Sequence, residues 1–171
     1  MTVADLDLLL PYEEIMFGSE AWSRQSYLDE LADSELRCYL VAESVAGRSG
    51  EAAAGEPEAG EPEARRSVEL LGSAGLLTIG ETAQILTVGV LPAARRRGIG
   101  TQLVQALVAE AIRRGADEVL LEVRIDNDAA RTLYEREGFE LLGVRRGYYD
   151  HGRVDALTMR LDVRAGGRRG H

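Results

Sequence analysis

The residues best suited to a chemical task lie between Gln84 and Gly100, where an apolar, β-branched run is followed by a proline, three arginines and two glycines. This order predicts a strand, a tight turn and the start of a helix. A helix N-terminus exposes unpaired N–H groups and the positive end of the helix dipole, so it attracts anions. Gly98 and Gly100 would let an anion approach the backbone, and the arginines add charged, forked donors. The stretch is therefore typical of a pyrophosphate site.

The same stretch has a purely structural interpretation, in which the glycines close a strand-to-helix turn and the arginines are merely solvated. Other phosphate motifs are easier to exclude. The chain contains no lysine, so the GK[ST] phosphate loop is absent, and no G-x-G-x-x-G occurs. The pattern that remains is R-x-x-G-x-G, from Arg95 to Gly100.

A second candidate is Glu122, which interrupts the apolar run 119–125. With a two-residue period, Glu122 shares one face of the expected strand with Arg124. A buried, unpaired carboxylate is costly. Glu122 is therefore either paired, with Arg124 or another neighbour, or it has a functional role.

A third candidate is Tyr134, in the segment that follows. Asn127 suits the N-cap of a helix, and Gly138 suits its C-terminal end. Tyr134 falls inside this helix. Its simplest interpretation is a core aromatic residue with a hydrated hydroxyl.

The elements that must position these residues can be read from hydrophobic spacing. A helical region over 5–17 should break at Pro11, and Ser23 should cap a second helix that ends near Asp33. A further helix should run from the glycine loop to Gly115. Strands are expected at 38–42, 68–79, 84–90, 119–125, 139–144 and 154–161, with a turn over 145–153 between the last two.

The domain organisation is simple, because 171 residues suit one domain. We expect a single domain over 1–163 and a frayed tail over 164–171. Residues 45–66 repeat Gly, Glu, Pro and Ala without an apolar face, which predicts a disordered insertion, with a docking arm as the alternative.

Composition excludes several classes of protein. The net charge of −9 argues against nonspecific nucleic-acid binding, and no apolar run is long enough to span a membrane. One cysteine, Cys38, and two histidines argue against a disulfide and a zinc site. The start lacks the basic region of a secretory signal, so we expect a cytoplasmic protein.

The R-x-x-G-x-G loop after an apolar strand resembles the acetyl-coenzyme A loop of the GNAT family of N-acetyltransferases. Three further stretches are similar to the ribosomal-protein-alanine N-acetyltransferases, the RimI subgroup: Leu-Glu-Val-Arg through Glu-Gly-Phe at 121–139, Arg-Arg-Gly-Tyr-Tyr at 145–149, and Trp-Ser at 22–23. The resemblance implies an α/β GNAT fold with a central, mixed, mostly antiparallel sheet flanked by helices. The first strand of that fold would be missing or very short here.

The resemblance also implies roles for individual residues. Glu122 would be the general base and Tyr134 the general acid. Tyr148 and Tyr149 would line the channel for the acceptor peptide. Acetyl-CoA would be held by backbone groups of the central strand, by the glycine loop and by an asparagine, at Val88, Gly89, Val90, Arg95, Arg96, Arg97, Gly98, Ile99, Gly100, Thr101 and Asn127.

The function implied is transfer of acetyl from acetyl-CoA, without a metal, to the N-terminal α-amine of a protein. By resemblance, the acceptor is the N-terminal alanine of a small-subunit ribosomal protein. The alternatives are an acetyltransferase for other N-termini, lysine side chains or small amines, and a noncatalytic acyl-CoA-binding partner protein. The oligomeric state is left open.

Overall fold

The computed structural model describes residues 1–45 and 68–164 of the chain. The predicted insertion falls outside these residues, apart from Val45, which ends the first strand. The predicted tail also falls outside, apart from Arg164. The Nε of Arg164 lies 2.7 Å from a carboxylate oxygen of Asp117.

Six strands form one open sheet in the order β1-β2-β3-β4-β6-β5. The β3–β4 pair is parallel and the other four pairs are antiparallel, which confirms the mixed, mostly antiparallel sheet. Residues 1–36 contain helices and turns, so β1 is the first strand of the described chain. The strands are β1 Arg37–Val45, β2 Val68–Ile79, β3 Thr82–Val90, β4 Glu118–Arg124, β5 Glu140–Tyr149 and β6 Val154–Asp162.

Three short helices precede the sheet, and their ends follow the local sequence signals. The predicted break at Pro11 is a 3-10 turn, Leu10–Tyr12, between α1 and α2. Gly18 ends α2 in a positive-φ conformation (58°) that glycine adopts readily. Ser23 caps α3, and its Oγ accepts a hydrogen bond from the N–H of Ser26 at 3.1 Å. The bounds are α1 Leu6–Leu9, α2 Glu13–Phe17 and α3 Arg24–Ala32.

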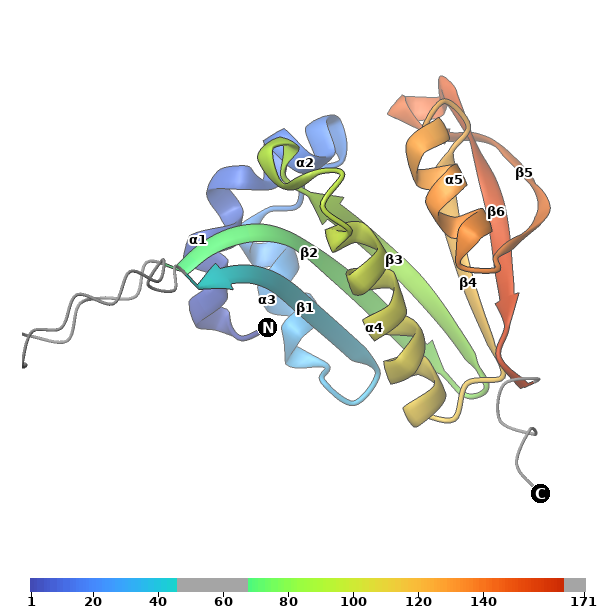
Figure 1. Ribbon diagram of the computed structural model, residues 1–171, viewed down its shortest axis with the longest axis horizontal. Coiled ribbons are helices and arrows are strands. Elements are labelled where there is room, and N and C mark those ends of the chain that lie inside the picture. Colours follow the sequence, from blue (N-terminus) through green and yellow to red (C-terminus); the bar gives the residue numbers. More distant parts are fainter. Residues whose placement is uncertain (46–67, 165–171) are drawn as a thin grey trace, which may run out of the picture.

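The helices cover both faces of the sheet (Figure 1). Helix α4, Ile99–Arg113, lies across one face of β2 and β3, and α1 to α3 lie behind β1 to β3. Helix α5, Asp128–Arg136, lies over β4 and β6. Apolar residues of α4 at helical spacing are buried in the core: Leu103, Val104, Leu107 and Ala111. None of the described helices is long and apolar enough to cross a membrane.

The parallel strands β3 and β4 pair over only four residues, from Thr82 with Glu118 to Ile85 with Leu121. The register of β2 with β3 shifts at this point, because Gly75 faces Thr87 while Leu76 faces Ile85. The intervening residue, Leu86, is therefore an extra residue in β3, as in a β-bulge. Beyond it, β3 and β4 diverge toward their carboxyl ends (Figure 1).

Strand β5 is longer than the sequence predicts. Residues 145–149 were expected in a turn because they contain a glycine and arginines, but β5 continues to Tyr149. The strand accommodates them as a bulge: Arg145 and Tyr149 lie four residues apart, yet their partners on β6 are Ala156 and Val154. The turn itself is shorter, Asp150–Gly152.

Candidate active site

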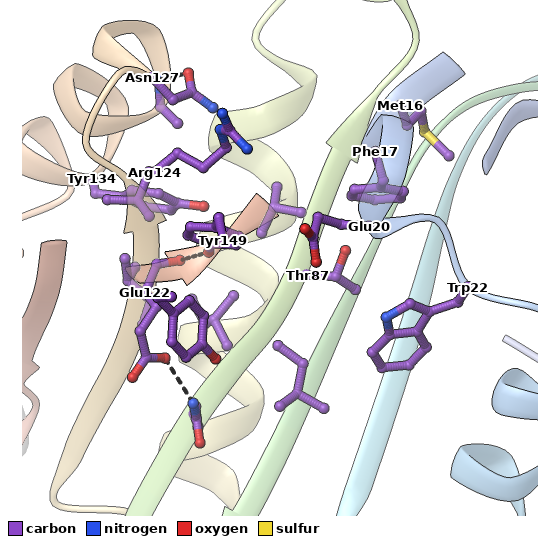
Figure 2. Close-up of a pocket in the computed structure, with 18 residues that line it drawn as sticks. Met16, Phe17, Glu20, Trp22, Thr87, Glu122, Arg124, Asn127, Tyr134 and Tyr149 are labelled. Atoms are coloured by element: carbon purple, nitrogen blue, oxygen red, sulfur yellow. Dashed lines mark hydrogen bonds between the residues drawn. The ribbon is translucent and has the colours of Figure 1, made fainter. Parts of the chain in front are cut away.

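A pocket of about 380 Å³ lies where β3 and β4 diverge. One side consists of residues from β4, α5 and β5, including Glu122, Tyr134 and Tyr149. The other side consists of residues from β3 and the α2–α3 region, including Thr87 and Phe17 (Figure 2). The structure therefore brings the two predicted catalytic residues into one cavity.

Glu122 is held by both neighbouring parts of the sheet. Its side chain is 11% exposed. The amide Nε2 of Gln84 donates to Oε2 of Glu122 at 2.8 Å, and the guanidinium Nη1 of Arg145 donates to Oε1 at 2.9 Å. Arg124, the partner considered from the sequence, instead binds Asp126 and Asp150. Glu122 is thus paired and also faces the pocket.

Tyr134 projects from α5 into the same pocket (Figure 2). It is 7% exposed, and its ring packs edge-on against Phe139 at 5.7 Å between centroids. Burial disfavours the charged phenolate and raises the pKa of Tyr134 to about 12. The hydroxyl therefore keeps its proton at neutral pH, as a hydrogen-bond or proton donor must.

Tyr148 and Tyr149 both line the pocket, as the resemblance implied for an acceptor channel. Their rings meet edge-on at 4.9 Å. The hydroxyl of Tyr149 donates to the backbone oxygen of Glu122 at 3.1 Å, and burial raises the pKa of Tyr149. The guanidinium of Arg145 lies 4.4 Å above the ring of Tyr148.

The wall opposite Glu122 was not predicted from the sequence. It is formed by side chains from the end of α2 and the following turn: Met16, Phe17, Glu20 and Trp22. Its position depends on Glu13, which is 3% exposed. One oxygen of Glu13 accepts from the Tyr27 hydroxyl at 2.5 Å and the other from the N–H of Trp22 at 3.0 Å. A glutamate within a short helical region gives little sequence signal for such a role.

Some of the predicted acetyl-CoA residues line the pocket, and the others lie outside it. Val88 and Asn127 line the pocket, whereas Gly89, Val90 and the loop 95–101 are not among its lining residues. They lie at the carboxyl end of β3 and the start of α4. Asn127 also caps α5, because its Oδ1 accepts from the N–H of Ala130 at 3.1 Å. Cofactor binding by all these residues stays a prediction.

The loop before α4 has the backbone geometry expected of an anion site. Gly98 is the N-cap of α4 with φ of 81°, and Arg96 has φ of 61°. The first hydrogen bond of the helix runs from the N–H of Gln102 to the carbonyl of Gly98. The N–H groups before Gln102 in the first turn therefore have no partner within the helix. The N-terminus of α4 can therefore offer donors to a phosphate.

Two of the glycines also have packing roles. A Cβ on Gly100 would lie 3.0 Å from the side chain of Leu133 in α5, and one on Gly89 would lie 2.4 Å from the ring of Phe17. These glycines let α5 approach the start of α4, and α2 approach β3, closely. The structural interpretation, in which glycines close the strand-to-helix turn, is consistent with Gly98 at the N-cap of α4. No group of three or more metal-ligating residues occurs in 1–45 or 68–164.

Comparison with known proteins relates the whole arrangement to a family. The sequence matches the acetyltransferase (GNAT) family over residues 10–139. It is 46% identical over 103 residues to the N-alpha-acetyltransferase RimI of Mycobacterium tuberculosis, covering 58% of this chain and 63% of that protein. It is 39% identical over 85 residues to the [ribosomal protein bS18]-alanine N-acetyltransferase of Escherichia coli K12, covering 48% of this chain and 57% of that protein. The chain therefore spans about three fifths of the length of these relatives.

Comparison with solved structures agrees with the sequence matches. The crystal structure of the ribosomal-protein-S18-alanine N-acetyltransferase from Escherichia coli matches with a TM-score of 0.69 at 24% identity, over 100% of this chain and 96% of that chain. That likeness shows a shared fold. Because the family match also spans most of the sequence, the chain belongs to the GNAT family of acetyltransferases.

Proposed function

We propose that this protein transfers the acetyl group of acetyl-CoA to the N-terminal α-amine of a protein. We propose further that the acceptor is a small-subunit ribosomal protein whose N-terminus begins with alanine, in the cytoplasm. The observation that carries the proposal is the convergence of Glu122 and Tyr134, from β4 and α5, on one pocket. The name of the Mycobacterium tuberculosis relative supports an α-amine as the acceptor group, and the name of the Escherichia coli relative supports the alanine of a ribosomal protein.

Glu122 is suited to receive the proton of the attacking amine. An α-ammonium group has an ordinary pKa near 8, so the neutral amine is accessible at little cost. The amine nitrogen forms a bond to the acetyl carbon and loses a proton to Glu122, directly or through water. Each carboxylate oxygen of Glu122 accepts one hydrogen bond in the structure, which leaves further acceptor capacity for that proton.

Tyr134 is suited to the other end of the reaction. As the carbon–sulfur bond breaks, the electron pair moves onto sulfur, and the Tyr134 hydroxyl donates a hydrogen bond to it. With a pKa of about 12, Tyr134 is a weaker acid than an ordinary thiol, near 8.5. Tyr134 therefore acts chiefly by stabilising the thiolate. The thiolate then gains a proton from solvent, and Glu122 releases the amine proton to solvent, so that overall one proton leaves the amine and one is gained by coenzyme A.

The open edge of β3 supplies the remaining groups that the proposed reaction needs. Beyond Ile85, β3 has no partner strand on the side of β4 within the described chain. Its backbone N–H groups on that edge are available to stabilise the tetrahedral oxyanion. In this proposal the pantetheine follows Val88 to Val90, and the phosphates lie at the N-terminus of α4.

The test uses two peptides and intact-mass measurement. The full chain is incubated with acetyl-CoA and a peptide that begins with the N-terminal alanine of the ribosomal protein. A second copy carries a blocked N-terminus and a free lysine. We expect acetyl gain on the free α-amine alone. Gain on lysine would support a broader acetyltransferase. No gain on either peptide, with acetyl-CoA binding intact, would contradict the proposal and favour the small-amine enzyme or the binding protein.

A further inference from the structure

Arg145 reaches the catalytic carboxylate from two strands away, because β6 lies between β5 and β4. Arg145 is paired with Ala156 of β6, and Ala156 is paired with Arg124 of β4. Residues paired across strands share a face of the sheet, and so do alternate residues along a strand. Arg145, Ala156 and Glu122 therefore share one face. The short side chain of Ala156 leaves room for the arginine to lie across β6.

The contact fixes Glu122 from both sides. Arg145 binds Oε1 at 2.9 Å from the side of β5, and Gln84 binds Oε2 at 2.8 Å from the side of β3. With one donor on each oxygen, the carboxylate can neither rotate about its last bond nor turn away without losing a contact. Neither donor consumes all the acceptor capacity of its oxygen.

The arginine is itself held in place. Its guanidinium lies 4.4 Å above the ring of Tyr148, within the range of cation–π contacts. The β5 bulge makes this possible, because it lets the side chains of Arg145 and Tyr148 meet on one side of the strand although the residues are three apart. The N–H of Gly147 donates to Asp155 at 2.8 Å and anchors the bulge.

We propose that Arg145 is a positioning residue that, together with Gln84, holds Glu122 in the orientation that receives the amine proton. This inference rests on the proposed function.

The other charged groups on this face are already engaged. Arg124 binds Asp126 and Asp150. Further along the face, Arg160 of β6 lies 3.9 Å from Glu118 of β4. The other titratable groups that line the pocket with Glu122 and Arg124 are Glu20 on the opposite wall and the hydroxyls of Tyr134, Tyr148 and Tyr149. Among the described residues, Arg145 is thus the cation in ion-pair contact with Glu122.

The test compares Arg145→Gln and Arg145→Lys with Arg146→Gln, a control that removes the same charge from the next, exposed residue. We expect Arg145→Gln to lower kcat about 10- to 100-fold, as a misplaced base would. The KM for acetyl-CoA should change less than about twofold. Arg145→Lys should restore part of kcat, and Arg146→Gln should behave like the wild type.

Equal kinetics for Arg145→Gln and Arg146→Gln would overturn the inference. Crystal structures of the wild type and Arg145→Gln give a readout that does not depend on activity. We expect Glu122 to leave its present orientation in the variant, and an unchanged orientation would also overturn the inference. If the wild type acetylates no amine, the proposed function fails, and the crystal structures still decide whether Arg145 fixes Glu122.

Discussion

Glu122 and Tyr134 face the same pocket, but Glu122 lies in a polar environment and Tyr134 in an apolar one. Glu122 lies in a polar network, with Gln84 and Arg145 on its two oxygens. Tyr134 is buried against Phe139, and burial alone raises its pKa. The oxygens of Glu122 keep acceptor capacity for a proton, and burial keeps the Tyr134 hydroxyl protonated, so the two environments suit a proton acceptor and a hydrogen-bond donor.

Replacing Tyr134 with phenylalanine should lower kcat about 10- to 100-fold, because one donor to the leaving sulfur is lost. The raised pKa of about 12 means that the Tyr134 hydroxyl loses its proton only as the pH rises through that value. The ratio of wild-type to variant kcat should therefore stay constant from pH 7 to about 10. Thiol release at each pH measures it, with Tyr12→Phe, outside the pocket, as the control. A ratio that falls steadily over this range would contradict the role of the neutral hydroxyl.

At the scale of the element, the bulge in β5 controls which side chains face the pocket. Gly147 has φ of 61°, and a Cβ there would lie 3.2 Å from backbone atoms of Gly152. Gly147→Ala should therefore destabilise the protein by about 1–2 kcal/mol. It should also raise the KM for the acceptor peptide, because Tyr148 and Tyr149 would shift.

Gly143 provides a matched control on the same strand, since a Cβ there meets nothing within 4 Å and its φ is not positive. Urea unfolding and acceptor kinetics of Gly143→Ala should remain close to those of the wild type. If Gly147→Ala were equally harmless, the bulge would not determine the pocket.

The C-terminal end of α4 is joined to β1 through Glu110. Hydrogen bonds from Arg113 and Arg114 lower the pKa of Glu110 to about 2, and Arg114 also donates to the backbone oxygens of Glu35 and Arg37. A carboxyl group with a lowered pKa stabilises the fold above its ordinary pKa, near 4.5, and this contribution is lost as the pH falls toward 2.

Glu110→Gln should therefore lower the free energy of unfolding at pH 7, and the difference from the wild type should shrink as the pH falls below about 4.5. Urea unfolding at pH 7, 5 and 3 measures both effects. Glu81→Gln, at an exposed position, should match the wild type throughout. A deficit for Glu110→Gln that grows on acidification would show that the ion pairs are not its source.

At the scale of the whole molecule, the site lies between two parts of one sheet. Strands β1 to β3 with α4 provide the strand and loop that we propose bind acetyl-CoA, and β4 to β6 with α5 provide Glu122 and Tyr134 (Figure 1). Four residue pairs join the parts at the start of β3 and β4, and beyond them the strands diverge. The pocket is therefore a consequence of incomplete strand pairing.

Much of this arrangement could be predicted from local sequence signals. The caps at Ser23 and Asn127 and the alternation of β4 depend on neighbouring residues and are confirmed. The partner of Glu122 could not be predicted, because Arg145 lies 23 residues away and its strand resembles a turn. The wall formed by Met16 and its neighbours depends on tertiary packing for the same reason.

The most direct test of the central claim is the rate of thiol release from acetyl-CoA in the presence of the alanine-starting peptide. It is measured for the wild type, Glu122→Gln and Glu118→Gln, which removes the same charge four residues away on the same face of β4. The account predicts a loss of about 10²- to 10⁴-fold for Glu122→Gln, unchanged acetyl-CoA binding, and a Glu118→Gln rate within about threefold of the wild type. A Glu122→Gln enzyme as active as the wild type, or equal losses in both variants, would contradict it.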